Sequence, residues 1–155
     1  MKLSPAPYHD PTKPGKPAKS LYADQNEVKK KVIEFLRPYL KRKPFFKRVW
    51  IWGSLSKGTF GVYHQPYRGH EGSDIDLLVE VDEKHPVPNE LKEIKEWAKT
   101  RDYSRAFTSS LFFENPLPNG KARHEAQFIC HFPSKHTKKR FYSKVAEAEL
   151  IHESA

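Results

Sequence analysis

Cysteine is nearly absent from this sequence, with Cys130 as the single one among 155 residues. One cysteine cannot form a disulfide framework within the chain or a cysteine-based zinc cluster. Long apolar runs are also missing, and none approaches the roughly 20 residues needed to cross a bilayer. The first ten residues, MKLSPAPYHD, lack the apolar segment of a secretory signal. These absences favour a soluble, cytoplasmic protein without a membrane partner.

Acidic residues are in the minority. Lys and Arg number 28 against 19 Asp and Glu, which gives a formal net charge of +9 and a pI near 9.6. Such a surface attracts polyanions, including nucleic acids, nucleotides and anionic lipids. A solvated basic surface without a polyanionic partner has the same composition, so the charge leaves both interpretations open.

The length predicts one domain, and a hydrophobic fraction of 37% is enough for its core. Residues 1–20 contain five prolines and four lysines and little to bury. This composition predicts a flexible or extended tail, followed by one domain over residues 21–155. The tail is either an inert extension or an arm that touches a phosphate backbone.

Apolar periodicity and turn residues predict an alternation of helices and strands after the tail. Pro38 is expected to end or kink the first helix near Arg37. A mixed β-sheet flanked by helices, an α+β architecture, accommodates the order. The expected elements are a helix from residue 24 to about 40, strands at 48–52 and 74–81, a helix within 89–100, strands within 104–113 and 122–132 joined by a hairpin, and a helix from about 137.

Two aspartates stand two positions apart in the stretch GSDIDLLVE. In a strand, Asp74 and Asp76 point to one face about 7 Å apart, while Ile75 and Leu77 point to the other. Two charges in a strand built for burial are costly unless something compensates them, and Mg²⁺ is bound by such carboxylates together with substrate phosphates. The alternative is that Asp74 lies in the preceding turn and only Asp76 enters the sheet.

A glycine-serine turn follows the earlier strand in the stretch WIWGSLSKG. At such a junction, Gly53 lets a phosphate approach backbone N–H groups, and Ser54 adds a hydroxyl donor. Lys57 adds a positive charge one turn later, and Gly58 keeps the backbone open. The spacing is not that of a P-loop, so the stretch does not indicate an ATPase of that type.

The two stretches together, GSLSKGT and then GSDIDLLVEV, resemble the nucleotidyltransferase superfamily typified by DNA polymerase β, and most closely its minimal stand-alone members. The resemblance covers about residues 49–81. It implies the nucleotidyltransferase (polymerase β-type) fold and two Mg²⁺ ions, with Mn²⁺ as an alternative. It also implies transfer of a nucleoside monophosphate from an NTP, by default ATP, to a hydroxyl of an RNA, a protein or a small molecule.

The resemblance also assigns roles to residues. Gly53 and Ser54 would hold the β- and γ-phosphates, and Asp74 and Asp76 would ligate the metals. The remaining nucleotide-binding residues would be Lys57, Gly58 and Ser73.

A third acidic residue on a later strand is implied as well, to help hold a metal and to take the proton from the acceptor hydroxyl. Glu125 is the one acid in the strand RHEAQFICHF, where alternation puts it on the face opposite His124. A salt bridge to Arg123, or a solvent-facing position, is the alternative. Glu114, at the far end of the hairpin, is a poorer choice.

Residues 59–72 separate the two stretches more widely than the resemblance implies. This insertion is either a loop over the active site that contacts an acceptor or base, or a neutral surface segment. The eight histidines form no spaced pair such as HExxH, and His64 and His70 are expected at the surface. A second function also stays open, in which a non-catalytic protein of this fold binds nucleic acid or a partner protein, for example as an antitoxin, through its basic surface.

Overall fold

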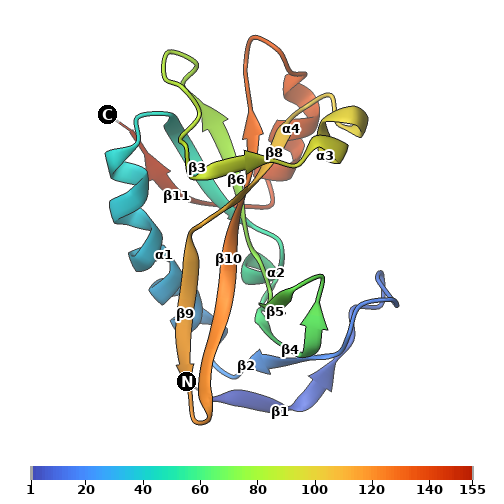
Figure 1. Ribbon diagram of the computed structural model, residues 1–155. Coiled ribbons are helices and arrows are strands. Elements are labelled where there is room, and N and C mark those ends of the chain that lie inside the picture. The colour runs from blue at the N-terminus through green and yellow to red at the C-terminus, as the bar shows by residue number, and fades with distance from the viewer. Residues whose placement is uncertain (1, 155) are drawn as a thin grey trace.

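A computed structural model describes residues 2–154 of the chain. The fold is α+β with a mixed sheet and flanking helices, as the order of elements predicts (Figure 1). The helices are α1 (Gln25–Arg42), α2 (Ser54–Lys57), α3 (Lys95–Thr100) and α4 (Lys138–Val145). The strands are β1 (Leu3–Tyr8), β2 (Lys19–Tyr22), β3 (Phe46–Trp52), β4 (Gly61–Tyr67), β5 (His70–Gly72), β6 (Ile75–Val81), β7 (Leu91–Glu93), β8 (Arg105–Ser109), β9 (Phe112–Leu117), β10 (Gly120–His131) and β11 (Glu149–Glu153).

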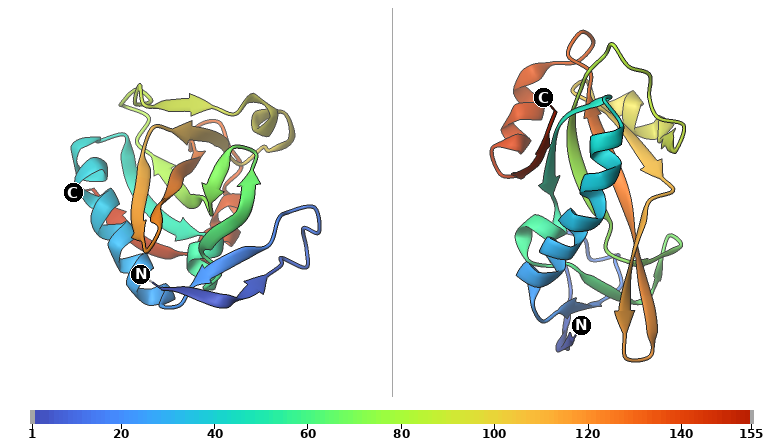
Figure 2. Two further views of the ribbon diagram at one scale, coloured as in Figure 1. Left: turned by 60° about the horizontal axis from the view of Figure 1, so that its bottom comes forward. Right: turned by 90° about the vertical axis from the view of Figure 1, so that its left-hand side faces the viewer.

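The strands form two sheets. The large sheet has the order β11-β3-β6-β10-β8-β7, with β9 paired to β10, and the small sheet has the order β1-β2-β4-β5. At the centre of the large sheet, β6 runs antiparallel to β3 and parallel to β10. The helix α1 covers one face of this sheet, and α3 and α4 pack on the other (Figure 2). The central strands are therefore buried on both faces for most of their length.

The helix α1 begins where the sequence predicts. Asp24 accepts a hydrogen bond from the backbone N–H of Glu27 at 3.0 Å, and this capping satisfies one of the free N–H groups of the first turn. Pro38 does not end the helix, which continues to Arg42. The prediction of a break near Arg37 was wrong because Pro38 lies on the exposed side of α1, while the apolar stripe on the other side continues into the core. The buried residues of that stripe are Val28, Val32, Leu36, Tyr39 and Leu40.

Two parts of the expected secondary structure differ. The helix expected within 89–100 is divided into the strand β7 and the short helix α3. Leu91 pairs with Ser109 of β8 and is buried, whereas no residue of α3 is. Pairing with a neighbouring strand thus outweighs a helical pattern over so few residues. The strand β11 was not predicted, and it pairs with the edge of β3 and buries Ile151.

The N-terminal segment is not a tail in the described residues. The strand β1 pairs with β2, and β2 pairs with β4 of the segment 59–72, so the two segments without a predicted element form the small sheet together. The small sheet is held together by backbone hydrogen bonds between its strands. The side chain of Tyr22, which is 2% exposed, attaches the sheet to the core. At Gly61 an added Cβ would lie 2.2 Å from the carbonyl oxygen of Ser20, so the two strands need glycine there.

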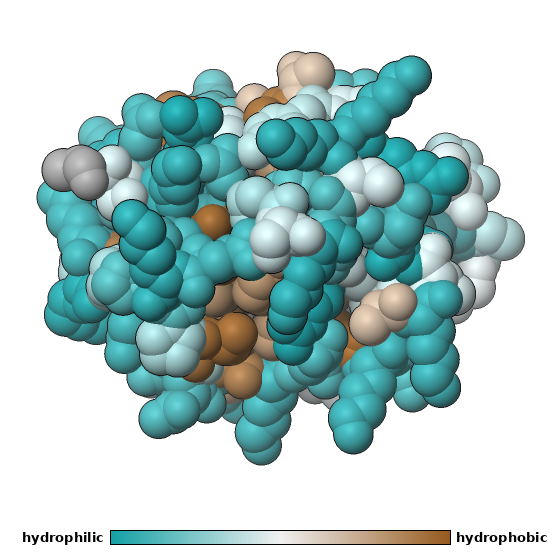
Figure 3. All heavy atoms as spheres, turned by 90° about the horizontal axis from the view of Figure 1, so that it is seen from above, coloured by the Kyte–Doolittle hydropathy of each residue, from teal (hydrophilic) through white to brown (hydrophobic). Residues whose placement is uncertain are grey.

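The surface is largely polar. Hydrophilic side chains cover most of the face shown in Figure 3, and apolar atoms show in smaller areas between them. Within residues 2–154, no helix is long and apolar enough to cross a membrane.

Candidate functional site

A cleft of about 560 Å³ lies on the face of the large sheet that α3 and α4 partly cover. Its floor includes Trp52 of β3, Asp76 of β6 and Gln127 of β10, and its two walls come from the small sheet and from the α3 and α4 side. Asp74 and Asp76 both line it. The cleft therefore brings residues from both ends of the chain around the aspartate pair.

The register of the sheet explains why the two aspartates face the cleft. Asp76 lies opposite Trp52 on one side and opposite Gln127 on the other. Ile75 and Leu77, which alternate with the aspartates, are fully buried on the α1 face. Although β6 itself begins one residue after Asp74, that side chain still points into the cleft, as alternation predicts.

At one end of the floor, Gly53 of the glycine-serine turn lies against Asp76. Gly53 has φ +75° and ψ −146°, a backbone conformation open almost only to glycine. A Cβ added there would lie 2.5 Å from Oδ2 of Asp76. The two motifs that are distant in sequence are thus in direct contact.

At the other end, three possible metal ligands meet. Parallel pairing of Ala126 with Ile75 places the preceding residues, Glu125 and Asp74, side by side. His70 joins them, and one ligand atom from each of the three lies within 4.8 Å of the other two. We call His70, Asp74 and Glu125 the histidine–carboxylate cluster.

Within the cluster, Nδ1 of His70 lies 3.0 Å from Oδ1 of Asp74. That oxygen is buried and has no hydrogen bond of good geometry among the described residues. Oε2 of Glu125 accepts a hydrogen bond from Gln127 at 3.0 Å. The guanidinium of Arg123 lies 4.0 Å from the ring centre of Phe112. The salt bridge between Glu125 and Arg123 is therefore not formed.

The floor is electrostatically unusual. Burial raises the pKa of Asp76 to about 7, and the charge of Asp74 adds to this. Burial also raises the pKa of Asp74 to about 6, which His70 opposes and Glu125 reinforces. Burial raises the pKa of Tyr63 to about 12, with both aspartates adding, so its phenol stays neutral beside them. Two half-buried carboxylates with raised pKa values are a place where a cation would be stabilised.

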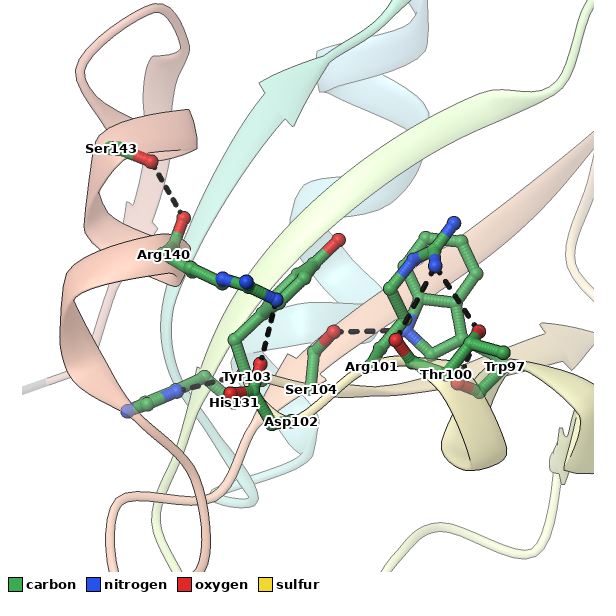
Figure 4. Close-up of polar contacts among 9 residues, drawn as sticks. All are labelled: Trp97, Thr100, Arg101, Asp102, Tyr103, Ser104, His131, Arg140 and Ser143. Atoms are coloured by element: carbon green, nitrogen blue, oxygen red, sulfur yellow. Dashed lines mark hydrogen bonds and ion pairs between the residues drawn. The ribbon is translucent and has the colours of Figure 1, made fainter.

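One wall comes from α3, α4 and the end of β3 (Figure 4). Nε1 of Trp97 donates to Oγ of Ser104 at 2.9 Å, which fixes the indole, and Arg101 lies over its ring at 5.0 Å. On the same wall Nζ of Lys144 lies 4.6 Å from the ring centre of Trp52. The apolar and aromatic residues of this wall and the adjoining floor are Trp52, Ile94, Trp97, Tyr103, Ala106 and Ile129.

The other wall comes from the small sheet and from the β1–β2 connection. It contains Tyr63, Tyr67, Arg68, Lys13 and Lys16. Both walls thus combine aromatic rings with cations, and the anionic floor lies between them.

None of the five expected nucleotide-binding residues is among those that line the cleft. Ser73 is 1% exposed, and its hydroxyl accepts hydrogen bonds from Nζ of Lys19 at 3.0 Å and from the N–H of Gly61 at 3.1 Å. Its side chain therefore ties the small sheet together. Gly53 borders the floor at Asp76, Ser54 begins α2, Lys57 is exposed on that helix, and Gly58 follows it.

Sequence reasoning missed His70 and the cations of the cleft. His70 was expected at the surface because no second histidine stands at a ligand spacing, and its partners come from two other strands. Lys16 belongs to the supposed tail, and Lys144 belongs to the last helix. The only signal in the sequence was their charge, which 28 Lys and Arg residues share.

The cluster fits a divalent cation. Its donors are two carboxylates and one imidazole, and the buried Oδ1 of Asp74 has Nδ1 of His70 as its near neighbour at 3.0 Å. Carboxylates suit Mg²⁺ and Mn²⁺, and an imidazole favours Mn²⁺ over Mg²⁺. The sequence assigned the metals to Asp74, Asp76 and Glu125, but the structure groups His70, not Asp76, with the other two.

Comparison of the chain with models of known families, with curated proteins and with solved structures finds no match.

Proposed function

We propose that this protein is a metal-dependent nucleotidyltransferase with the polymerase β-type fold, which transfers a nucleoside monophosphate from an NTP to an acceptor hydroxyl. The order of groups along the cleft floor carries the proposal. Gly53 lies against Asp76 at one end, and the rest of the histidine–carboxylate cluster lies against Asp74 at the other. This order supports phosphate binding at the Gly53 end and acceptor binding at the Asp74 end.

In the proposed reaction, the acceptor oxygen attacks the α-phosphorus of the NTP. The bond between that phosphorus and the oxygen bridging to the β-phosphate breaks, and pyrophosphate leaves. The hydroxyl proton goes to a carboxylate, for which Glu125 has the suitable position. Divalent cations held by Asp76 and the histidine–carboxylate cluster would neutralise the phosphate charge that the carboxylates otherwise repel.

Besides the metals, a bound nucleotide needs a surface for its base and positive charges for its phosphates, and the walls provide both. The indole of Trp97 is held by a hydrogen bond and offers a face for a base, and Lys144 and Arg101 offer charges for phosphates. ATP is the NTP to test first. RNA, a protein or a small molecule remain the candidate acceptors at this level.

One observation favours a second candidate, a non-catalytic protein of this fold that binds nucleic acid or a partner protein. His70 lies within ion-pair distance of Asp74, and a protonated imidazole there would neutralise the carboxylate without any metal. The basic walls would then bind a polyanion directly.

Calorimetric titration with ATP distinguishes the two. The wild type is measured with EDTA, with Mg²⁺ and with Mn²⁺, beside the double variant Asp74→Asn/Asp76→Asn. Glu114→Gln, which removes an acidic charge from the β9–β10 hairpin, is the matched control. We expect binding that requires a metal, is retained in Glu114→Gln and is lost in the double variant. If the wild type binds no NTP with either metal, the proposal of a nucleotidyltransferase is refuted. The non-catalytic binding protein is then the better candidate.

A further inference from the structure

The hairpin β4–β5 presents two tyrosine rings to the cleft. The ring centres of Tyr63 and Tyr67 are 5.6 Å apart, and both side chains are half-buried. Nζ of Lys16 lies 5.5 Å and the guanidinium of Arg68 lies 5.2 Å from the ring centre of Tyr67. An aromatic pair with two cations over the ring of Tyr67 is therefore built into this wall.

The backbone holds this arrangement in place. Arg68 and Gly69 both have positive φ, as a two-residue hairpin turn of type I′ requires, and Tyr67 pairs with His70 across it. The N–H of His64 donates to the carbonyl of Ala18 at 2.9 Å, which attaches the hairpin to the β1–β2 connection. That connection carries Lys13 and Lys16. Lys16 is thus held over the ring of Tyr67, and Lys13 lines the same wall.

The hairpin adjoins the Asp74 end of the floor. Its second strand begins with His70, a member of the histidine–carboxylate cluster. Tyr63, on its first strand, lies close enough for the charges of both aspartates to act on its phenol. The charges of Lys13 and Lys16 also act on Asp76, so this wall runs along both aspartates. Its hairpin meets the floor through His70 at the Asp74 end, where the acceptor is assigned.

The aromatic and cationic side chains of this wall indicate which class of acceptor it binds. Aromatic faces stack unpaired bases, and Lys and Arg hold the connecting phosphates, which together form the usual surface for single strands. Four cations, Lys13, Lys16, Lys19 and Arg68, lie on or next to this wall and would repel a cationic small molecule. We infer that the β4–β5 hairpin, with Lys13 and Lys16, binds the 3′ end of a single-stranded nucleic acid and presents its terminal hydroxyl to the cluster. This inference rests on the proposed function, since it names the acceptor.

The test is fluorescence anisotropy with short labelled oligonucleotides, in EDTA and without NTP. Single-stranded RNA, single-stranded DNA of the same sequence and the RNA duplex are compared. Tyr67→Ala should weaken single-strand binding at least about fivefold, because stacking is lost, while Tyr67→Phe should bind like the wild type. Tighter binding of RNA than DNA would support an RNA acceptor, and equal binding would support either single strand.

Charge removal provides a second measurement. Lys16→Ala/Arg68→Ala should make the logarithmic salt dependence of binding shallower by about 1.4, since two phosphate contacts are lost. The matched control Lys30→Ala/Lys41→Ala removes the same charge from exposed positions of α1 and should leave the dependence unchanged. Equal weakening by both pairs would overturn the inference, because binding would then reflect net charge. Duplex binding as tight as single-strand binding, or no binding at all, would overturn it too.

Calorimetry with ATP separates this inference from the proposed function. Tyr67→Ala should keep metal-dependent ATP binding while it loses oligonucleotide binding. Loss of ATP binding in Tyr67→Ala with the oligonucleotide still bound would overturn the inference, because the hairpin would then hold the nucleotide. If the wild type binds oligonucleotides through Tyr67 but binds no ATP, the proposed transferase function is refuted. The inference that the hairpin binds a single strand is then still supported.

Discussion

Gly53 is the single residue on which the geometry of the cleft floor depends most directly. Its conformation and its contact with Asp76 each require the absence of a side chain. Gly58, at the other end of α2, also has a positive φ of 78°, but an added Cβ there would meet nothing within 4 Å. Substitution of Gly58 therefore introduces backbone strain alone, whereas substitution of Gly53 introduces both backbone strain and a steric clash with Asp76.

We expect Gly53→Ala to lower the free energy of unfolding by about 1–3 kcal/mol through backbone strain, and also to displace Asp76 and abolish metal-dependent ATP binding. Gly58→Ala should cost about 1 kcal/mol and leave ATP binding intact. Urea unfolding and calorimetry on the two variants measure both effects. Intact ATP binding in Gly53→Ala would show that the contact with Asp76 is not needed.

Among the elements, α4 shows how one apolar side chain positions a wall of the cleft. Phe141 is fully buried, stacks on His131 at 4.7 Å and lies edge-on to Trp50 at 6.2 Å. Lys144, three residues later, reaches Trp52 in the cleft. Phe141 is the one fully buried side chain of α4, and Tyr142 and Val145 pack partly against the same cluster.

Phe141→Ala should therefore lower the free energy of unfolding by about 3–5 kcal/mol, because it removes a fully buried ring and leaves a cavity. Phe35→Ala is the matched control, since Phe35 lies on α1 at 37% exposure and its loss should cost about 1 kcal/mol. Urea unfolding followed by circular dichroism measures the difference. Equal effects of the two substitutions would contradict the role of Phe141 as the anchor of α4.

At the scale of the whole molecule, His124 joins the two sheets. It lies on β10 in the large sheet, and its Nδ1 donates to the carbonyl of Ser73 at 2.8 Å. Its Nε2 then accepts from the hydroxyl of Tyr22 on β2 at 2.7 Å. Its ring packs 4.4 Å from that of Phe60, and burial lowers its pKa to about 4. The neutral form of this histidine is thus part of the junction that holds the small sheet over the cleft.

The stability of the protein should depend on pH through this residue. Above pH 6.5, the ordinary pKa of histidine, His124 is neutral in both the folded and the unfolded chain and its contribution is fully present. As the pH falls from 6.5 to 4, the unfolded chain takes up the proton first, and about 3 kcal/mol of unfolding free energy is lost. Urea unfolding of the wild type and of His124→Asn, across this range in EDTA, measures it.

The asparagine variant should be less stable near neutral pH but should lose less stability on acidification. Asp74 and Asp76 titrate in both proteins, so the difference between the two curves isolates the histidine. Parallel curves would mean that His124 is not held neutral.

The central strands and the first helix were predictable because their signals are local. The cap at Asp24 and the alternation through β6 depend on neighbouring residues, and the structure confirms them. A hairpin before β10 is present as well, but its first strand is β9, because the strand expected within 104–113 is divided into β8 and β9 and Asn115 and Pro116 lie in a strand, not in a turn. The small sheet was not predictable, because its strands bind through backbone hydrogen bonds between segments of little apolar periodicity. The strands β7 and β11 escaped prediction for the same reason.

For the site, strand alternation and chain order predicted that Asp74 and Asp76 share a face and that a glycine follows the neighbouring strand, with a turn position of Asp74 as the alternative. The fold then brings Gly53 against Asp76, His70 to Asp74 and Glu125, and lysines from both ends of the chain into the cleft. Such contacts depend on strand register and sheet order, which are set by packing across the whole domain and leave no local pattern in the sequence.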